Sequence, residues 1–297
     1  MGVTVVVPTV DRIALLERCL QALADQDDQA EQVVVVHDGA PSVVSLLSTW
    51  HDRLPLQALQ IRERGVSAKR NAGWRAATQD LVAFTDDDCA PTPSWVSALR
   101  GEPADLIAGP VVPHPDDPAD GSVFGRTITV TTAGPYFPGA NVAVRRSELE
   151  AVQGFDESLT AGEDTDLAWR LKANGALVSW CPEAVVQHAV RPVTFPQHLR
   201  SLWRWRALPL VLRRHPGLRD ALVHRVFWKQ SHPLALLGLV GLLLSLRDRR
   251  GAALLLPLVA RRWYERGPRF GTQVAVADVA EVAVVAVGSF RHGTLLL

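Results

Sequence analysis

The sequence predicts an α/β protein with a mostly parallel sheet, followed by a helical region that is both apolar and basic. Short β-branched runs alternate with stretches of helical spacing, and the runs are apolar throughout, as strands covered on both faces are. Charge divides the chain: residues 1–190 hold 14 Lys and Arg against 26 Asp and Glu, whereas residues 191–297 hold 17 against 5. We therefore expect one large domain at 1–190 and a different, appended region at 191–297.

The elements of the first domain follow from these patterns. The run VTVVVP is β-branched and ends at a proline, and the next stretch repeats apolar residues at helical spacing. Strand and helix alternate at the pace of right-handed βαβ units. We expect strands at 3–8, 32–40, 56–61 and 80–88 and helices at 13–26, 43–50 and 67–78, with Ser67 as N-cap of the last helix.

The second half of this domain is less regular. Residues 101–138 are rich in Pro, Gly and Asp, which predicts a long, partly mobile connection. Two helices are expected at 147–155 and 163–175, with Gly175 at the C′ position of the second. Residues 176–190 then return as strands.

The region 191–297 interleaves Arg with Trp and Leu. Its longest apolar runs lie at 232–246 and 251–260, and both are shorter than the ~20 apolar residues of a spanning helix. Basic and Trp-rich helices bind anionic membrane surfaces, so we expect a peripheral position on the inner face of the cell membrane. The alternatives are a helical subdomain that packs on the first domain, or an oligomer contact.

Composition excludes several classes of function. The three cysteines, Cys19, Cys89 and Cys181, are far apart and form no CxxC pair, so a zinc site is not expected. The acidic first domain argues against nucleic acid as the main ligand. A strand begins at once after the first residues, which predicts a cytoplasmic protein without a signal peptide.

Acidic residues follow three of the predicted strands. Thr9 and Asp11 come after the first strand, Asp38 after the second, and the triplet 86–88 (DDD) after a later one. Ligands of open parallel sheets bind beyond the carboxyl ends of the strands, so these carboxylates should converge there. A cluster of carboxylates is costly unless a cation or hydrogen-bond donors neutralise it. The pattern predicts Mg²⁺ or Mn²⁺ that joins the aspartates to a diphosphate.

Four segments, in order, resemble the family 2 glycosyltransferases of the GT-A fold over residues 3–190. They are VVVPTVDR, VVVVHDGA, the block RGVSAKRNAGWRAATQDLVAFTDDDCAP, which ends in a DxD motif, and the block FPGANVAVRRSELEAVQGFDESLTAGEDTDLAWRLKANG. The resemblance implies an enzyme that transfers a sugar, with inversion, from a nucleoside-diphosphate sugar to a hydroxyl acceptor. UDP is the most frequent donor nucleotide in such families, and GDP and dTDP fit the same residues.

The resemblance also implies roles for individual residues. Asp164 would be the catalytic base, oriented by Glu163, and Asp88 would bind the metal with His188. The residues implied around the nucleotide-sugar are Pro8, Thr9, Asp11, Asp38, Arg70, Asn71, Asp86, Asp87, Gly139 and Asn141, with no chemical role assigned to Asp87. Ordinary alternatives stay open: acidic residues are common at a helix start, and a lone histidine after a strand is often a packed imidazole.

Processive members of the family carry a Gln-x-x-Arg-Trp motif after this domain. Here SLWRW has Ser201 in the place of the Gln, so polymerisation is not expected. If the tail binds membrane, the acceptor would be lipid-linked or part of an envelope glycan. A sugar nucleotidyltransferase is one alternative, although PTVDRIALL lacks the glycines of a phosphate loop. A non-enzymatic membrane adaptor that keeps the fold is the other.

Overall fold

The computed structural model describes residues 1–62, 65–117, 124–125 and 127–297. The chain divides into two compact units. The described residues of 1–117, 127–159 and 163–191 form the first, here called the α/β unit, and those of 124–125, 160–162 and 192–297 form the helical unit. The connection expected at 101–138 extends over residues 118–123 and 126, which lie outside the described residues.

A seven-stranded sheet forms the centre of the α/β unit, in the order β3-β2-β1-β4-β8-β6-β9. Its strands are β1 (Val3–Pro8), β2 (Gln32–His37), β3 (Leu56–Gln60), β4 (Leu81–Phe84), β6 (Leu106–Ala108), β8 (Val142–Arg145) and β9 (Val178–Trp180). The pairs β1–β2, β2–β3, β1–β4 and β6–β9 are parallel, and β8 is antiparallel to both of its neighbours. The predicted mostly parallel sheet is therefore confirmed, with one reversed strand inserted.

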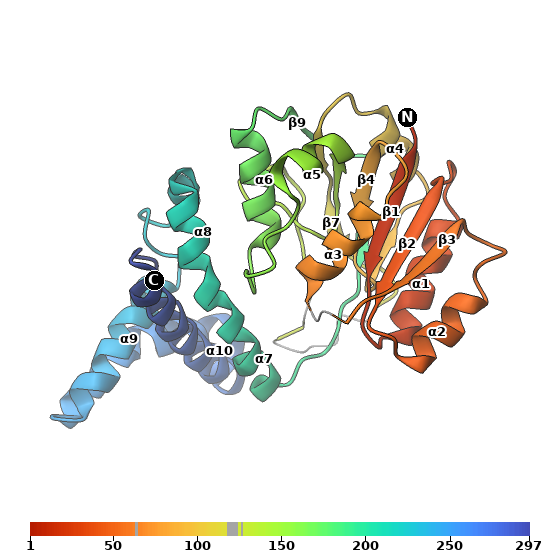
Figure 1. Ribbon diagram of the computed structural model, residues 1–297. Coiled ribbons are helices and arrows are strands. Elements are labelled where there is room, and N and C mark those ends of the chain that lie inside the picture. Colours follow the sequence, from red (N-terminus) through yellow and green to blue (C-terminus); the bar gives the residue numbers. More distant parts are fainter. Residues whose placement is uncertain (63–64, 118–123, 126) are drawn as a thin grey trace. The chain divides into compact units, whose positions relative to one another are not determined.

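Successive residues of the strands point to opposite faces of the sheet and so belong to two separate hydrophobic cores. Val5 of β1 packs with Leu16 and Trp95 in one core, whereas the next residue, Val6, packs with Trp74 and Phe84 in the other. The first core is covered by α1 (Ile13–Ala24), α2 (Pro41–Ser48) and α4 (Trp95–Gly101), and the second by α3 (Val66–Arg75), α5 (Arg146–Val152) and α6 (Glu163–Ala173). Figure 1 shows α1 and α2 on one face of the sheet and α3, α5 and α6 on the other.

A second, three-stranded sheet brings the end of another strand next to the residues that follow β4. It consists of β5 (Cys89–Pro91), β10 (Val186–His188) and β7 (Val111–Pro113), in the order β5-β10-β7. β5 and β10 are antiparallel, and His188 pairs with Cys89. This register brings the end of β10 next to the Asp86–Asp88 triplet, which directly precedes β5.

Three local expectations have different outcomes. Gly175 has a φ of +95°, and the bonds from its amide to Lys172 and from Ala176 to Leu171 close a Schellman cap, so the predicted C′ glycine is confirmed. Ser67 is not the N-cap of α3, because that helix begins at Val66, after Gly65. The connection at 101–138 is partly ordered, since it contains β6 and β7.

The helical unit is built from short helices around one long one. Its elements are α7 (Phe195–Leu202), η1 (Trp203–Ala207), α8 (Leu208–Arg214), η2 (Pro216–Ala221), α9 (His232–Ser245), η3 (Arg249–Leu255) and α10 (Leu256–His292). Ala235, Leu258, Ala275 and Val282 form a small core. α10 bends at Gly267, whose φ of +75° is not helical.

The stretch Arg249–His292 is long and apolar enough to cross a membrane by length and composition, which the sequence pattern did not predict. The acidic residues of this stretch are paired inside the unit. Arg262 Nη2 is 2.7 Å from Asp278 Oδ2, and Lys229 Nζ is 2.6 Å from Glu281 Oε2. The bend at Gly267 and these paired charges are features of a packed helix as much as of a spanning one.

Candidate active site

Asp87 lies at the centre of a buried cluster where β1 and β4 end. Its side chain is fully buried, and Oδ2 accepts from Thr9 Oγ1 at 2.7 Å and from the Val10 amide at 3.2 Å. The Arg12 guanidinium donates to both carboxylate oxygens. Burial raises the pKa of Asp87 to about 6, although the charge of Arg12 opposes the shift. Asp87 therefore ties the segment after β1 to the end of β4.

Asp38, after β2, is exposed and lies opposite a buried lysine of α3. Lys69 Nζ is 3.8 Å from Asp38 Oδ2 and also donates to the backbone carbonyl of Thr9. Burial lowers the pKa of Lys69, and the charges of Asp38 and Asp87 oppose that shift. Lys69 thus links the ends of β1 and β2 and leaves part of the Asp38 carboxylate open to solvent.

Asp88 faces His188 at the junction of the two sheets, and both residues are buried. Asp88 Oδ1 is 3.6 Å from His188 Nε2. The other oxygen, Oδ2, pairs with Arg12 and, at 3.3 Å, with Arg191. One carboxylate oxygen is therefore neutralised by guanidinium groups, and the other is directed at the imidazole.

His188 has the arrangement of a metal-binding histidine. Its Nδ1 is 2.8 Å from the carbonyl oxygen of Ala189, which can only accept, and a neutral ring that donates there has its Nε2 lone pair free for a metal ion. That lone pair faces Asp88 Oδ1, which is also an acceptor, and a cation between them would satisfy both. Two ligand atoms 3.6 Å apart can each lie about 2.1 Å from one ion.

Cys89 lies beside this pair and is the third potential ligand. Ligand atoms of Asp88, Cys89 and His188 lie within 4.8 Å of one another. Burial raises the pKa of Cys89 well above its ordinary value, so the side chain stays a thiol. The oxygen of Asp88 and the imidazole of His188, without a thiolate, suit Mn²⁺ or Mg²⁺.

Arg70 of α3 organises a second group of charges. Its guanidinium is buried and donates to Asp86 Oδ1 at 2.8 Å and to Glu163 Oε1 at 3.1 Å. Burial lowers the pKa of Arg70, but the nearby carboxylates outweigh it and the pKa is raised. Gly139 makes room for this guanidinium, because a Cβ there would lie 2.7 Å from Arg70 Nη1.

Asp164 stands at the start of α6, next to this group. Its Oδ2 accepts from the Gly139 amide at 2.9 Å, and its Oδ1 accepts from the Thr165 amide at 2.7 Å. Burial and then the charge of Glu163 raise the pKa of Asp164 to about 6, against the opposing charge of Arg70. The carboxylate is therefore held in one orientation and is a stronger base than an ordinary aspartate.

Two asparagines expected near the nucleotide-sugar make hydrogen bonds inside the protein. Asn71 donates to Phe155 O and Glu157 Oε1 and accepts from the Phe155 amide and Trp74 Nε1, which uses the whole capacity of the amide.

Asn141 is fully buried and is held in a similar way. Its Nδ2 donates to the carbonyls of Pro110 and Ala184, and its Oδ1 accepts from Trp95 Nε1. The family resemblance implied both asparagines as residues near the nucleotide-sugar. In the structure their hydrogen bonds cross-link segments of the fold, and a ligand role stays a prediction.

The remaining predicted residues lie at the ends of β1 and β2. Pro8 is the last residue of β1 and pairs with Val36 of β2. Asp11 is exposed and accepts from Ser42 Oγ of α2 at 2.6 Å. The described contacts of Asp11 do not connect it to the other predicted carboxylates. Asp11 therefore lies at the same edge of the sheet but outside the network of ion pairs that those carboxylates form.

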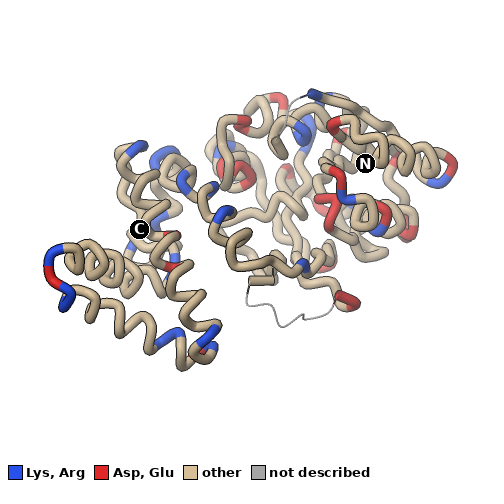
Figure 2. Tube along the Cα trace, turned by 90° about the horizontal axis from the view of Figure 1, so that it is seen from below, with Lys and Arg blue, Asp and Glu red and all other residues tan. Residues whose placement is uncertain are grey.

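The sequence interpretation named Arg70 but missed three other basic residues of the site. Arg12, Lys69 and Arg191 each contact a predicted acidic residue, and Arg12 spans two of them. A charge argument could have found them, since a gathering of carboxylates requires cations at the same place. Figure 2 shows red and blue segments meeting in the α/β unit, whereas the helical unit carries mainly blue.

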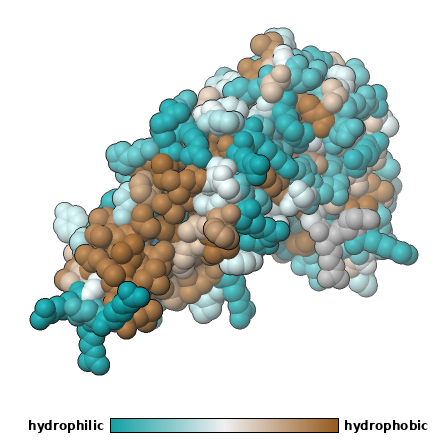
Figure 3. All heavy atoms as spheres, turned by 60° about the vertical axis from the view of Figure 1, so that its left-hand side comes forward, coloured by the Kyte–Doolittle hydropathy of each residue, from teal (hydrophilic) through white to brown (hydrophobic). Residues whose placement is uncertain are grey.

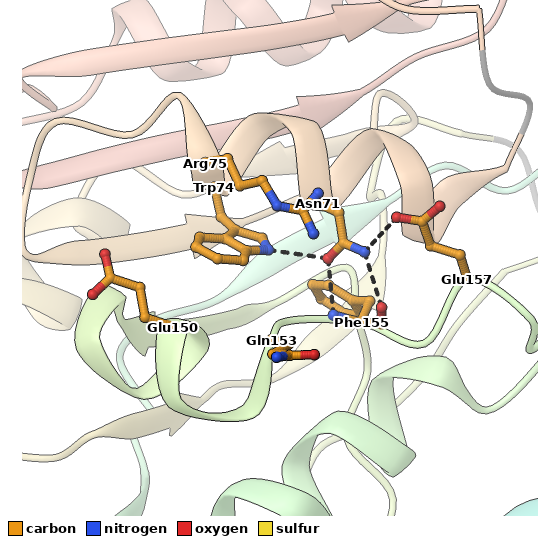
Figure 4. A pocket seen from close by; sticks show the side chains of 7 residues that line it. All are labelled: Asn71, Trp74, Arg75, Glu150, Gln153, Phe155 and Glu157. Carbon is orange, nitrogen blue, oxygen red and sulfur yellow. Dashed lines mark hydrogen bonds between the residues drawn. The ribbon is translucent and has the colours of Figure 1, made fainter.

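A pocket of about 380 Å³ lies beside the site, between α3, α5 and residues 153–157. Figure 4 shows Trp74 and Asn71 of α3 facing Gln153 and Phe155, with Glu150 and Glu157 at its sides. Asn71 is the one predicted site residue in its lining, and its hydrogen bonds are directed at Phe155 and Glu157 (Figure 4). The carboxylates of the strand ends do not line this pocket.

The described fold is of the GT-A class, and comparisons with known proteins show the family to which the chain belongs. The family model Glycosyl transferase family 2 matches residues 4–131, and Glycosyl transferase family group 2 matches residues 120–263. The chain belongs to the family 2 glycosyltransferases.

Similar curated proteins are longer than this chain. The pre-mycofactocin glycosyltransferase of Mycobacterium tuberculosis is 30% identical over 239 residues, which are 74% of this chain and 50% of that protein. The validoxylamine A glucosyltransferase of Streptomyces hygroscopicus is 28% identical over 270 residues, 76% of this chain and 63% of that protein. The chain therefore spans about half to two thirds of the length of these relatives.

Solved structures share the fold. Residues 1–349 of S. aureus TarS in complex with UDP superpose with a TM-score of 0.53 at 18% identity, covering 99% of this chain and 92% of that one. The mannosyltransferase PcManGT from Pyrobaculum calidifontis, in complex with GDP-Man and Mn²⁺, gives 0.60 at 20% identity, covering 98% and 86%. At these identities the likeness establishes the GT-A fold.

Proposed function

We propose that the protein is a metal-dependent, inverting glycosyltransferase that moves a sugar from a nucleoside-diphosphate sugar to a hydroxyl acceptor. The observation that carries the proposal is the facing pair of Asp88 and His188, two buried metal-type donors 3.6 Å apart at the end of a parallel strand. The presence of UDP in the TarS complex and of GDP-Man with Mn²⁺ in the PcManGT complex supports this kind of donor.

The proposed donor site follows the ends of β1, β2 and β4. Asp38 has a carboxylate open to solvent and would accept hydrogen bonds from the nucleoside, with Pro8, Thr9 and Asp11 beside it. Asp86, held by Arg70, would accept from a hydroxyl of the ribose or sugar. UDP is the expected nucleotide, and GDP and dTDP are the alternatives for the test.

Asp88 and His188 would hold Mn²⁺ or Mg²⁺. A bound divalent ion supplies positive charge that stabilises the departing diphosphate. His188 Nδ1–H stays on the Ala189 carbonyl, which keeps Nε2 directed at Asp88. The protein's part is to keep these two donors facing each other within a buried, hydrogen-bonded frame.

Asp164 would take the proton of the acceptor hydroxyl as that oxygen attacks the anomeric carbon. The amides of Gly139 and Thr165 hold its two oxygens, and the raised pKa, about 6, makes the ionised form a better base while it still predominates at pH 7. Glu163 would help orient the site through its ion pair with Arg70.

The helical unit is proposed to bind the inner face of the cell membrane, which would favour a lipid-linked or envelope acceptor. Leu243 and Leu246, in and just after α9, are 60% and 83% exposed, and the basic residues Arg247, Arg249 and Arg250 follow them. Figure 3 shows hydrophobic residues gathered on the helical unit, with hydrophilic ones projecting beyond them. Exposed leucines beside arginines match an anionic lipid surface.

A thermal-shift screen tests the donor site. UDP, GDP and dTDP are added with and without Mn²⁺, and a ligand at 100 times its Kd stabilises by about 2.7 kcal/mol. One nucleotide should raise the Tm, and Asp88→Asn should abolish the part of the shift that needs Mn²⁺. Absence of any nucleotide- and Mn²⁺-dependent shift in the wild type would reject the proposal.

A flotation assay tests the membrane proposal separately. The wild type should float with vesicles that contain phosphatidylglycerol and less with phosphatidylcholine alone. The double variant Leu243→Ser/Leu246→Ser should stay in the soluble fraction, whereas Val44→Ser, an exposed valine of α2, should float like the wild type. Equal flotation of all three proteins would reject a role for α9.

A further inference from the structure

We infer that Lys69 of α3 is a positioning residue of the nucleoside site, which holds the Asp38 carboxylate in the orientation that accepts from the nucleoside. The inference rests on the proposed function, and it adds a residue that the family resemblance did not imply. The Asp38 side chain is 34% exposed, whereas the Lys69 side chain is 5% exposed. One member of this ion pair therefore faces solvent, and the other supports it from inside the protein.

Lys69 connects the two segments beside which the nucleoside is proposed to bind. Its Nζ donates to the backbone carbonyl of Thr9, after β1, and lies 3.8 Å from Asp38 Oδ2, after β2. Thr9 is buried and its amide donates to the carbonyl of Val36 in β2, so this end of the connection is fixed. Asp38 stands outside the strand, because β2 ends at His37. Among the described ion pairs, the one with Lys69 ties the Asp38 side chain to the fold.

Other charges near Lys69 do not replace this pairing. Asp87 attracts the ammonium and Arg12 repels it, and these two groups form an ion pair with each other, so their effects on Lys69 oppose. His37, beside Asp38, is neutral at pH 7 because burial lowers its pKa. The charge of Asp38 consequently acts on Lys69 more strongly than any other of these charges.

Loss of the ammonium would leave the Asp38 carboxylate free to change its rotamer. An exposed side chain without a fixed partner samples several staggered rotamers, and a ligand that needs one of them binds less tightly. Loss of one well-oriented hydrogen bond to a charged group weakens binding roughly 10- to 100-fold. Lys69 should therefore act on nucleoside affinity, and it should do so only while the Asp38 carboxylate is present.

The test is a double-mutant cycle with an uncharged nucleoside as the probe. Uridine, guanosine or thymidine is used, according to which of UDP, GDP and dTDP raises the Tm. Loss of a positive charge cannot weaken an uncharged probe by long-range attraction, so the cycle isolates the effect of position. Lys69→Met should weaken nucleoside binding, measured by nuclear magnetic resonance titration, at least about tenfold.

Asp38→Ala should weaken nucleoside binding by a similar factor. The double variant Lys69→Met/Asp38→Ala should bind within about twofold of Asp38→Ala alone, because Lys69 then has no carboxylate to position. The cycle is run with the nucleoside diphosphate as well, where the same coupling is expected.

Two further variants control for charge and for folding. Lys172→Met removes an exposed lysine of α6 that lies over the Trp169 ring, and should leave the nucleoside affinity within about twofold of the wild type. Lys69→Met removes the donor to the Thr9 carbonyl and should lower the Tm, so circular dichroism checks its fold. Lys69→Gln, which is neutral and can still donate, takes its place in the cycle if the methionine variant does not fold.

Unchanged nucleoside affinity in the Lys69 variant would overturn the inference. Additive losses in the double variant would overturn it too, because Lys69 would then not act through Asp38. Failure of the proposed function has a different sign: the wild type itself would show no nucleotide- and Mn²⁺-dependent shift in the Tm.

Discussion

Replacement of Asn71 by alanine separates a structural role from a ligand role. The side chain makes four hydrogen bonds of 2.7–3.0 Å, and three of its partner groups, Phe155 O, the Phe155 amide and Trp74 Nε1, belong to buried residues. The fourth partner, Glu157, is exposed and can be hydrated again. The variant therefore leaves three buried polar groups without their present partner.

The magnitude follows from the cost of such groups. An unsatisfied buried donor or acceptor costs about 1–3 kcal/mol, so three groups set a range of about 3–9 kcal/mol. The adjacent pocket of about 380 Å³ (Figure 4) admits water to part of the gap, which favours the lower end. We expect a loss of about 3 kcal/mol, or roughly 6–12 °C in the Tm of the α/β unit.

The assay is thermal unfolding followed by circular dichroism, with nucleotide affinity measured by calorimetry well below the Tm. Asn71→Ala should lose stability and keep nucleotide affinity within about threefold. Asn174→Ala, an exposed asparagine after α6, should change stability by less than about 0.5 kcal/mol. A variant with unchanged Tm and lost nucleotide binding would refute the structural assignment and restore Asn71 as a ligand residue.

Three other predictions concern the base, the glycine beside it and the helical unit. In the proposed mechanism Asp164 acts when ionised, so log kcat/KM should fall with decreasing pH below about 6. Folding raises the pKa of Asp164, so the ionised carboxylate destabilises the fold at higher pH, and Asp164→Asn should raise the Tm more at pH 7.5 than at pH 4.5. Gly139→Ala places a Cβ against the Arg70 guanidinium, so the rate of sugar transfer should fall at least a hundredfold. The Mn²⁺ affinity, measured by calorimetry, should change little. Asp278→Ala removes one carboxylate partner of Arg262 and leaves Glu265 as the other, so the free energy of unfolding of the helical unit should fall by about 2 kcal/mol. An unchanged unfolding transition would contradict this.

The sequence predicted the features that depend on local pattern and chain order. Apolar runs that end in polar residues were sufficient to place Asp38 and Asp86–Asp88 at one edge of a parallel sheet, because parallel strands end together. The three-residue strands β6 and β7 were missed, since such short segments carry no periodicity of their own. The described structure also gives a stretch long enough to span a membrane where the pattern, interrupted by charges, predicted none.

The roles of individual polar side chains could not be read in the same way. Asn71 and Asn141 stand in the segments that resemble the family blocks, yet their side-chain amides are hydrogen-bonded to groups up to 86 and 46 residues away in sequence. Lys69 and Arg12 were overlooked because nothing in their local sequence indicates that Asp38 and Asp87 lie opposite them. Whether a polar residue is saturated by the protein is a property of tertiary packing, and it decides how much of it remains for a ligand.

In the proposed function, the charges of the site form two groups with different chemical tasks. Asp88 and His188 would hold the divalent cation, whose two positive charges balance the doubly negative diphosphate of a nucleotide-sugar. Around Arg70, three carboxylates, Asp86, Glu163 and Asp164, share one guanidinium, and the surplus negative charge contributes to the raised pKa of Asp164. Such a surplus favours the positive charge that develops on a sugar ring as its bond to the leaving group breaks.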